Sequence, residues 1–339
     1  MKLQKYKKTI VGLSILSIIL IASLLYPYYG PADFNKVTYL YDKKGNLIGV
    51  PPIPPSSHYL LGSDRNGADI LYMMIFGAKF TLLTAFGVTL FRVLIGSVLG
   101  LLFSLWLKRL LPLVKDFLVV FNLVPPILIT LVLMYPVSTN YIKDSIYSVM
   151  IYQIIILVIM GIPSVLFMTV DIVDELKKKT FIQCSYLMGG NHYHVLKTQI
   201  KPYLTSYGLL MVIQQLLGTL LLMMYLGAFQ VYIGGVSKEE VRGLPLLNSI
   251  SKEWAGLVGQ NYREFYMSPW VVLIPLACYF ILILIINMIK KELDEVLDIN
   301  SLGNLSKQKK KSKKKKKMKE QSPTYSLNAK DFTFHRELK

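Results

Sequence analysis

Long apolar runs separated by polar segments form the main pattern of this chain. Six runs reach or exceed the roughly 18 residues that mark a membrane-spanning helix. They lie at about 9–26, 81–106, 113–135, 146–170, 207–233 and 270–289. The pattern therefore predicts an all-α integral membrane protein with six transmembrane helices.

The first run follows a basic start that contains Lys2, Lys5, Lys7 and Lys8. A cleaved signal peptide is one interpretation of this arrangement. The run is longer than a typical signal-peptide core, however, and no clear small-x-small cleavage site precedes Pro27. We therefore expect an uncleaved first helix at 9–26, after a basic N-terminus at 1–8.

Lysine and arginine residues alternate between the loops in the way that the positive-inside rule describes. The basic loops carry Lys108, Arg109 and Lys115, then Lys177, Lys178, Lys179, Lys197 and Lys201, then Lys290 and Lys291. The other loops, at 27–80, 136–145 and 234–269, carry sparser and more mixed charge. This alternation predicts that both termini lie in the cytosol and that 27–80 is the largest external segment.

Much of the net charge of +18 lies near the C-terminus, where 307–319 hold ten lysines and no acidic residue. Such low-complexity composition predicts a Lys-rich, disordered cytosolic tail at 299–339. The tail is either simply solvated or attracted to anionic lipid headgroups near the last helix. Nucleic acid is not an expected partner, because no aromatic residues interleave with the lysines.

The external segment carries turn signals before the second apolar run. Residues 42–46 favour a hairpin turn between β-prone flanks. Further on, Asp64 and Asn66 favour turns, Gly67 can adopt a positive φ, and Asp69 can cap the following helix. A cation site formed by Asp64, Asn66 and Asp69 is an alternative, although its spacing departs from the twelve-residue calcium loop.

Polar and helix-breaking residues interrupt the apolar runs. Arg92 lies near the middle of the second run, where a charge costs at least about 2.5–3.5 kcal/mol. It therefore meets either a structural partner or a path in which it contacts a substrate carboxylate. Gln214 and Gln215 in the fifth run either join helices or line a path. The Pro125-Pro126 pair and Pro163 favour kinked helices, which are tolerated beside a cavity.

Motifs for catalysis and nucleotide binding are missing from the sequence, including a phosphate-binding loop, a dinucleotide fingerprint and a catalytic triad. Cys184, His192 and His194 could be imagined as zinc ligands, but their spacing matches no zinc pattern. The two cysteines, Cys184 and Cys278, do not suggest a disulfide framework. These observations predict a non-enzymatic chain without a metal or cofactor of its own, which conducts or transports.

The most distinctive polar segment is the predicted cytosolic loop at 171–203. Within it, a helix-compatible stretch breaks at Gly189 and Gly190, resumes, and ends at Pro202. Connections between bundle helices are usually about 2–8 residues long. A hinged loop of this length predicts a docking surface for something outside the membrane.

This loop resembles the EAA loop of permease subunits from ATP-binding-cassette importers. That family has Glu-Ala-Ala, a Gly four residues after the last Ala, and then Ile-x-Pro. Gln183, Cys184 and Ser185 stand at the Glu-Ala-Ala positions, and Gly189, Ile200 and Pro202 stand at the others. The spacing is kept, whereas the neutral Gln183 replaces the leading Glu.

Other segments resemble one branch of that family, the dipeptide/oligopeptide/nickel-type permeases. The positions that match the branch's L-G-T-D-x-x-G-R-D segment include Gly62, Asp64, Gly67 and Asp69, with Ala68 in place of the Arg. Glu253-Trp254 and Ser268-Pro269-Trp270 resemble its external E-W and A-P-W motifs. The order of these pieces over about 9–298 is similar to the C-type subunit of such permease pairs.

The resemblance implies the type I permease fold, with a core of five helices at 81–298 after the first helix. It also implies a bacterial cell membrane and partners on other chains. These partners are a second permease, two cytosolic ATPases that bind ATP and Mg²⁺, and an external binding protein. The binding protein would dock on external segments that include Leu61 to Asp69 and Val236 to Tyr266.

The resemblance also implies roles for particular residues. A docking helix from Phe181 to Met188 would couple the ATPases to the membrane helices, with Gly189 and Gly190 as its turn. Arg92, Gln214 and Gln215 would line a path for short peptides. Three other functions stay open: a transport-inactive peptide sensor or scaffold, an importer of nickel or another polar solute, and a self-contained channel or secondary transporter.

Overall fold

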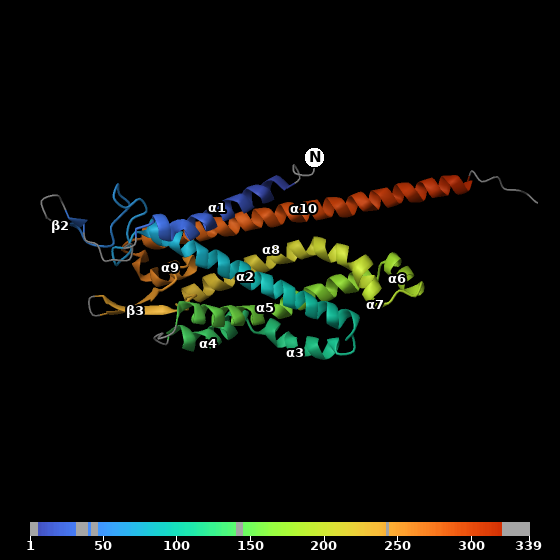
Figure 1. Cartoon of the computed structure of the whole chain (residues 1–339), viewed down its shortest axis with the longest axis horizontal. Coiled ribbons are helices and arrows are strands. Elements are labelled where there is room, and N and C mark those ends of the chain that lie inside the picture. The colour runs from blue at the N-terminus through green and yellow to red at the C-terminus, as the bar shows by residue number, and fades with distance from the viewer. Residues whose placement is uncertain (1–5, 32–39, 42–46, 140–144, 242–243, 321–339) are drawn as a thin grey trace, which may run out of the picture. The chain divides into compact units, whose positions relative to one another are not determined.

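The computed structural model describes the backbone of residues 6–31, 40–41, 47–139, 145–241 and 244–320. Side chains are described in these ranges except at 40–41, 47–48, 119–122, 139, 239–241, 244–246 and 297–320. The long helices are α1 (Lys7–Tyr29), α2 (Ile70–Leu105), α5 (Ile146–Lys177), α8 (Lys201–Ala228) and α10 (Trp270–Glu320), shown in Figure 1. The shorter helices are α3 (Leu111–Leu123), α4 (Pro126–Thr139), α6 (Thr180–Leu187), α7 (His192–Val195) and α9 (Trp254–Gln260).

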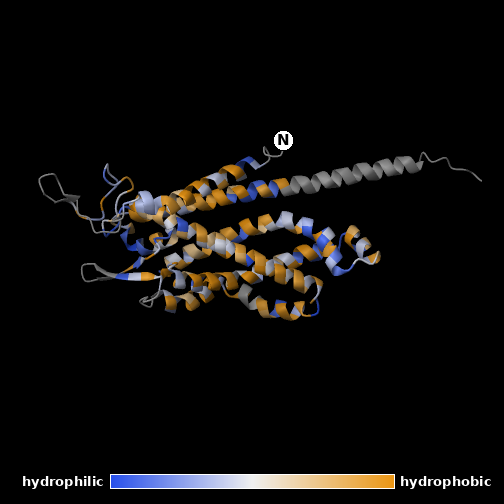
Figure 2. Cartoon of the chain, in the orientation of Figure 1, coloured by the Kyte–Doolittle hydropathy of each residue, from blue (hydrophilic) through white to orange (hydrophobic). Residues whose placement is uncertain are grey.

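Five of the described helical stretches are long and apolar enough to cross a membrane: Lys7–Tyr29, Ile70–Leu105, Ile146–Lys177, His192–Ala228 and Trp270–Val296. They correspond to five of the six expected spans, and Figure 2 shows apolar residues along them. The prediction that 113–135 forms one spanning helix with a kink at Pro125-Pro126 is wrong. The chain there forms α3 and α4, which are interrupted before Pro126 because two successive prolines remove two backbone N–H donors.

Helix α2 is the central helix of the first of two compact units, Met1–Leu293, and contacts α1, α5, α8 and α9. Two glycines bring it close to α5. A β-carbon at Gly96 would lie 2.6 Å from Val165, and one at Gly100 would lie 2.7 Å from Thr169. Such small-residue contacts let helix backbones approach each other in a membrane. Apolar side chains fill the remaining space between these helices.

Helix α1 has no side-chain cap of its own, and α10 supplies one. The Glu292 carboxylate accepts hydrogen bonds from the Lys8 N–H at 2.9 Å and from the Thr9 N–H and hydroxyl at 2.6 Å each. The first N–H groups of a helix have no partner within that helix. Glu292 therefore provides the acceptors for these groups at the start of α1, although it lies 284 residues from Lys8 in the sequence.

Two antiparallel hairpins accompany the helices. Strands β1 (Leu40–Tyr41) and β2 (Leu47–Gly49) pair on either side of 42–46, which confirms the expected hairpin, although the turn itself lies outside the described residues. Strands β3 (Val236–Val241) and β4 (Leu244–Ser249) pair from Val236↔Ser249 to Val241↔Leu244, and neither they nor α9 was expected from the sequence. Arg65, in the loop before α2, donates hydrogen bonds to Leu247 and Asn248 of β4 and to Gln260 of α9. We call the region of β3, β4, α9 and the loop at 61–69 the hairpin end.

The second unit is Asp294–Lys339. Within it the backbone of α10 continues as helix to Glu320, where the sequence predicts a disordered tail. Lysine is a good helix former, and the Lys-rich run at 307–319 contains no glycine or proline. The composition is thus compatible with helix as well as with disorder.

Candidate functional site

Arg92 is buried in the first unit and hydrogen-bonded to two neighbouring helices. From α2, its Nε and Nη2 donate to the Leu157 carbonyl of α5 at 2.8 and 2.6 Å. Its Nη1 donates to the Thr219 hydroxyl of α8 at 2.9 Å. All three bonds go to neutral oxygens, and no carboxylate of the described residues acts on the guanidinium. Arg92 thus has structural partners but no compensating negative charge.

Gly161 provides the space that the guanidinium occupies. A β-carbon at this position would lie 2.1 Å from Arg92 Nε and 2.3 Å from Cδ. The sequence favours a kink at Pro163, yet α5 runs as helix through that proline. In the structure Gly161 permits the contact between α2 and α5.

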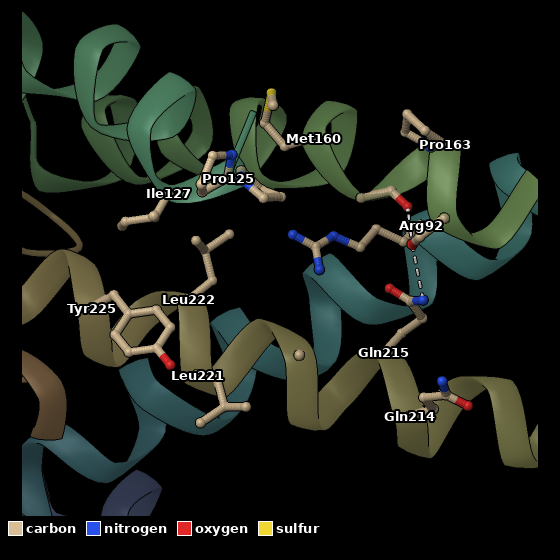
Figure 3. Close-up of a pocket in the computed structure, with 14 residues that line it drawn as sticks. Arg92, Pro125, Ile127, Met160, Pro163, Gln214, Gln215, Leu221, Leu222 and Tyr225 are labelled. Carbon is tan, nitrogen blue, oxygen red and sulfur yellow. Dashed lines mark hydrogen bonds between the residues drawn. The ribbon is translucent and has the colours of Figure 1, made fainter. Parts of the chain in front are cut away.

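A cavity of about 470 Å³ lies beside Arg92, between the start of α4, α5 and α8 (Figure 3). Figure 3 shows the Arg92 guanidinium pointing into it. The residues that line it are Arg92, Pro125, Pro126, Ile127, Met160, Gly161, Pro163, Ser164, Gln214, Gln215, Gly218, Leu221, Leu222 and Tyr225. Its volume falls within the range of about 300–1,000 Å³ that small-molecule sites occupy.

The three polar residues predicted for a path all line this one cavity. Gln215 is buried and donates from Nε2 to the Ser164 hydroxyl at 3.1 Å, which joins α8 to α5. Gln214 is exposed and makes no such bond among those of the described residues. The two amides therefore differ: one joins helices, and the other is free to line the cavity.

At the hairpin end, the polar residues before α2 stabilise their own loop. Asp64 accepts hydrogen bonds from the backbone N–H groups of Asn66 and Ala68, both at 2.9 Å. Asp69 accepts from the Leu71 N–H at 2.8 Å and caps α2, so the predicted cap is confirmed. Burial raises the pKa of the Asp64 carboxyl, and the positive charge of Lys252 opposes this shift.

Two glycines shape the same loop. Gly62 has φ of +79° and Gly67 has φ of +85°, a backbone conformation that side chains with a β-carbon rarely adopt. The positive φ that the sequence predicts for Gly67 is therefore confirmed. Gly62 and Gly67 act through the backbone conformation of the loop.

The Glu253-Trp254 pair holds α9 against α2. Glu253 is 1% exposed and accepts a hydrogen bond from the Ala255 N–H at 2.9 Å, which caps α9. Burial raises the pKa of its carboxyl to about 7. Trp254 donates from Nε1 to the Met74 carbonyl at 2.8 Å. This motif thus builds the interior of the hairpin end.

The hinged loop forms α6 and α7, which pack on the far ends of α2 and α5. We call this region the loop end. Ile182 of α6, Val195 of α7 and Ile200 of the turn after α7 are fully buried. They pack in one cluster with Leu105 of α2 and with Val173 and Leu176 of α5. Lys177 of α5 donates to the carbonyl and hydroxyl of Ser104 in α2. The loop and the two helix ends are therefore joined by a continuous set of contacts.

The opposite face of α6 is exposed. Gln183 and Cys184 are exposed, whereas Ser185 is buried. Leu187 and Met188 are 86% and 82% exposed, which is unusual for large apolar side chains on a polar loop. The ring of Phe181 stacks on Tyr203 at 5.9 Å between centroids.

The turn after α6 depends on two glycines for different reasons. Gly189 has φ of +88° with open space around it. A β-carbon at Gly190 would lie 2.7 Å from the Ser185 carbonyl oxygen. The first glycine supplies a backbone conformation, and the second allows a close approach.

The expectation that the second helical piece ends at Pro202 is wrong. The chain passes through a π-helical turn, Leu196–Ile200, and α8 begins at Lys201. A proline in the first turn of a helix removes an N–H that needs no partner there. The π-helical turn and the position of Pro202 together let one long helix run from His192 to Ala228.

Metal ligation finds no support in the part of the chain that the structure describes. No group of three or more His, Cys, Asp and Glu side chains gathers there closely enough to hold an ion. The Nδ1 of His192 instead lies 3.2 Å from the Tyr186 hydroxyl. Cys184, His192 and His194 therefore do not form a ligand group, while Asp64 hydrogen-bonds to its own loop and Asp69 caps α2.

Sequence reasoning missed the residues that complete the Arg92 site. Leu157 contributes only its carbonyl, so its side-chain type carries no signal. Thr219 and Tyr225 lie in the fifth apolar run, where Thr219 is four residues after Gln215 and so on the same helix face. That spacing was the one signal available for Thr219.

Comparison with known proteins gives three relatives. No protein-family model matches the chain. It is 30% identical to the oligopeptide transport system permease protein AmiD of Streptococcus pneumoniae over 137 residues, which are 40% of this chain and 42% of that protein. It is 21% identical to the dipeptide transport system permease protein DppC of Alkalihalophilus pseudofirmus over 309 residues, 88% of this chain and 87% of that protein.

The third relative is the glutathione transport system permease protein GsiD of Pectobacterium atrosepticum. It is 23% identical over 247 residues, 72% of this chain and 73% of that protein. All three names describe permeases of peptide transport systems, and five described helices are apolar enough to cross a membrane. The chain is thus a multi-pass membrane protein that is similar to the permease proteins of oligopeptide, dipeptide and glutathione transport systems.

Proposed function

We propose that the chain is a permease subunit of an ATP-driven importer of short peptides in a bacterial cell membrane. One observation supports the mechanism best: α2 and α5 line the Arg92 cavity and also carry the loop end. The two helices pack closely at Gly96 and Gly100. A displacement imposed on α6 would therefore reach the cavity through a pair of tightly packed helices.

The partners follow from this arrangement. The loop end would dock on cytosolic ATPases that bind ATP and Mg²⁺, with Leu187 and Met188 as exposed apolar contacts. Lys108, Arg109 and Lys178 lie near the loop end, which fits the positive-inside rule for a cytosolic location of this end and of both termini. A second permease would complete the path, and anionic lipid would attract the Lys-rich tail.

The hairpin end would receive an external binding protein. Asp64 and Asp69 hydrogen-bond within their own loop. They would therefore set the shape of the docking surface, together with Gly62 and Gly67, while exposed neighbouring residues make the contacts.

The cavity favours peptides over nickel. Among the residues that the structure describes, its lining contains no Cys, His, Asp or Glu side chain, and these are the usual ligands of a transition metal. The positive charge of Arg92 would also repel a divalent cation. Amides, a hydroxyl and apolar side chains suit the mixed character of a short peptide.

Replacement of Gly189 tests the coupling. In Gly189→Val, a β-branched residue would have to adopt the φ of +88°, which costs about 1–2 kcal/mol and reshapes the exposed turn. We expect ATP-driven uptake to be abolished while membrane insertion stays normal. Gly208→Val is the matched control, because a β-carbon there meets nothing within 4 Å and the site lies in α8. Unchanged uptake in Gly189→Val would overturn the coupling role.

A transport-inactive peptide sensor is a second candidate. The exposed Gln183 has a neutral amide at the position where the family that this loop resembles has a carboxylate. Such a complex would show ATPase activity stimulated by a peptide-loaded binding protein without peptide accumulation. Restored accumulation in Gln183→Glu would identify the lost carboxylate as the cause.

A further inference from the structure

The Arg92 guanidinium has donors left over after its contacts with the protein. An arginine side chain carries five N–H groups, one on Nε and two on each Nη. Its three hydrogen bonds use the Nε group, one group of Nη2 and one of Nη1. One N–H on each terminal nitrogen therefore remains, and Figure 3 shows these nitrogens pointing into the cavity.

Two donors on the two terminal nitrogens of one guanidinium match the two oxygens of a carboxylate. Bidentate pairs of this kind are shorter and roughly twice as strong as neutral hydrogen bonds. A buried cation without an anion is also costly, so an anionic group that enters gains both hydrogen bonds and charge compensation. The Leu157 and Thr219 contacts hold the fork in place before the ligand arrives.

We propose that this cavity binds the C-terminal carboxylate of a short peptide, and that Arg92 is its anchor. The inference rests on the proposed function and adds a recognition site within the permease itself. The cavity of about 470 Å³ admits a ligand of a few residues. Its other polar groups, at Ser164, Gln214, Gln215 and Tyr225, are neutral and can hydrogen-bond to peptide amides.

The charge of the lining selects which end of the peptide binds. Arg92 is the one charged side chain among the described residues that line the cavity, so none of them compensates the ammonium group of a peptide N-terminus. A carboxylate is therefore favoured and an N-terminal ammonium is not. Blocking the C-terminal carboxylate of a peptide should therefore weaken binding, whereas blocking its N-terminus should not.

The test is equilibrium binding to the purified complex of the full chain with its copurifying partners, without the external binding protein. Labelled trialanine is the probe, with trialanine amide, N-acetyl-trialanine and sodium phosphate as competitors. We expect N-acetyl-trialanine to compete as well as trialanine and the amide to compete at least about tenfold more weakly. Equal competition by the amide would overturn the proposal. Competition by phosphate at the same concentration would identify a general anion site and would also overturn it.

Variants of Arg92 give a second readout. Arg92→Met removes the charge at similar length, and we expect it to lose the preference for the free carboxylate. Arg109→Met removes an exposed charge at the turn after α2 and should keep the preference. If Arg92→Met retained the preference, the anchor would lie elsewhere. If the variant fails to fold, the competition among the three peptides on the unchanged chain still decides the matter.

ATP-driven uptake by the complex separates this proposal from the proposed function. Uptake without any preference between the acid and the amide would refute only the anchor. Carboxylate-selective binding without uptake would refute transport and leave the anchor standing.

Discussion

Gly161 lies where any β-carbon would come within 2.1 Å of Arg92 Nε. The glycine on α5 and the arginine on α2 thus depend on each other. The pair explains how a charged side chain is accommodated deep within the first unit, and both residues line the cavity.

Gly161→Ala should therefore displace the guanidinium from the Leu157 carbonyl. We expect it to destabilise the protein by about 1–3 kcal/mol, the usual cost of overpacking a filled interior. Gly87→Ala in α2 is the control, because a β-carbon there meets nothing within 4 Å, and it should be neutral or slightly stabilising. Thermal unfolding of the purified variants measures both effects. Equal midpoints for the two variants would contradict the packing described here.

The Glu292 cap predicts a local effect on α1. In Glu292→Ala, the N–H groups of Lys8 and Thr9 lose their acceptor, and loss of such a cap costs about 0.5–2 kcal/mol. We expect faster hydrogen exchange at these two amides, with little change in the middle of α1. Glu295→Ala removes an exposed carboxylate nearby in sequence and should leave the exchange unaltered. Unchanged exchange in Glu292→Ala would show that the contact contributes nothing.

The buried carboxyl of Glu253 predicts a dependence of stability on pH. Its pKa is raised from 4.5 to about 7 by burial. Between these values the unfolded chain has released the proton while the folded chain retains it, so stability falls as the pH rises through this window and levels off above about 7. Glu253→Gln keeps an oxygen for the Ala255 N–H and does not titrate.

The measurement for Glu253 is the thermal midpoint of both proteins from pH 4.5 to pH 8. The unchanged chain should lose stability relative to Glu253→Gln as the pH rises to about 7. Parallel profiles across the whole range would argue against a neutral, buried carboxyl at the hairpin end.

The two faces of α6 predict two different phenotypes. Leu187→Ser combined with Met188→Ser alters exposed side chains only, so the fold should persist while ATP-driven uptake falls severalfold. Ile182→Ala removes a fully buried side chain and should cost about 2–5 kcal/mol of stability. Uptake and thermal midpoints, measured side by side, separate them. Normal uptake by the exposed-face variant would place the docking surface elsewhere.

The sequence predicts local features of this protein well and tertiary ones poorly. Apolar run length located five spans, and turn chemistry located the Asp69 cap, because both depend on neighbours in sequence. The contact of Arg92 with a backbone carbonyl and the need for Gly161 depend on residues 65 or more positions away. The helix through Pro202 was also missed, because a π-helical turn carries no recognised sequence pattern.

Accumulation of labelled trialanine in sealed vesicles tests the central claim most directly. The vesicles would contain the chain with its permease and ATPase partners, and the external binding protein would be added outside. The account predicts that the internal peptide concentration exceeds the external one only when ATP is hydrolysed. Equilibration without ATP would indicate a channel, and stimulated ATP hydrolysis without accumulation would indicate a sensor; either result would contradict the proposed importer.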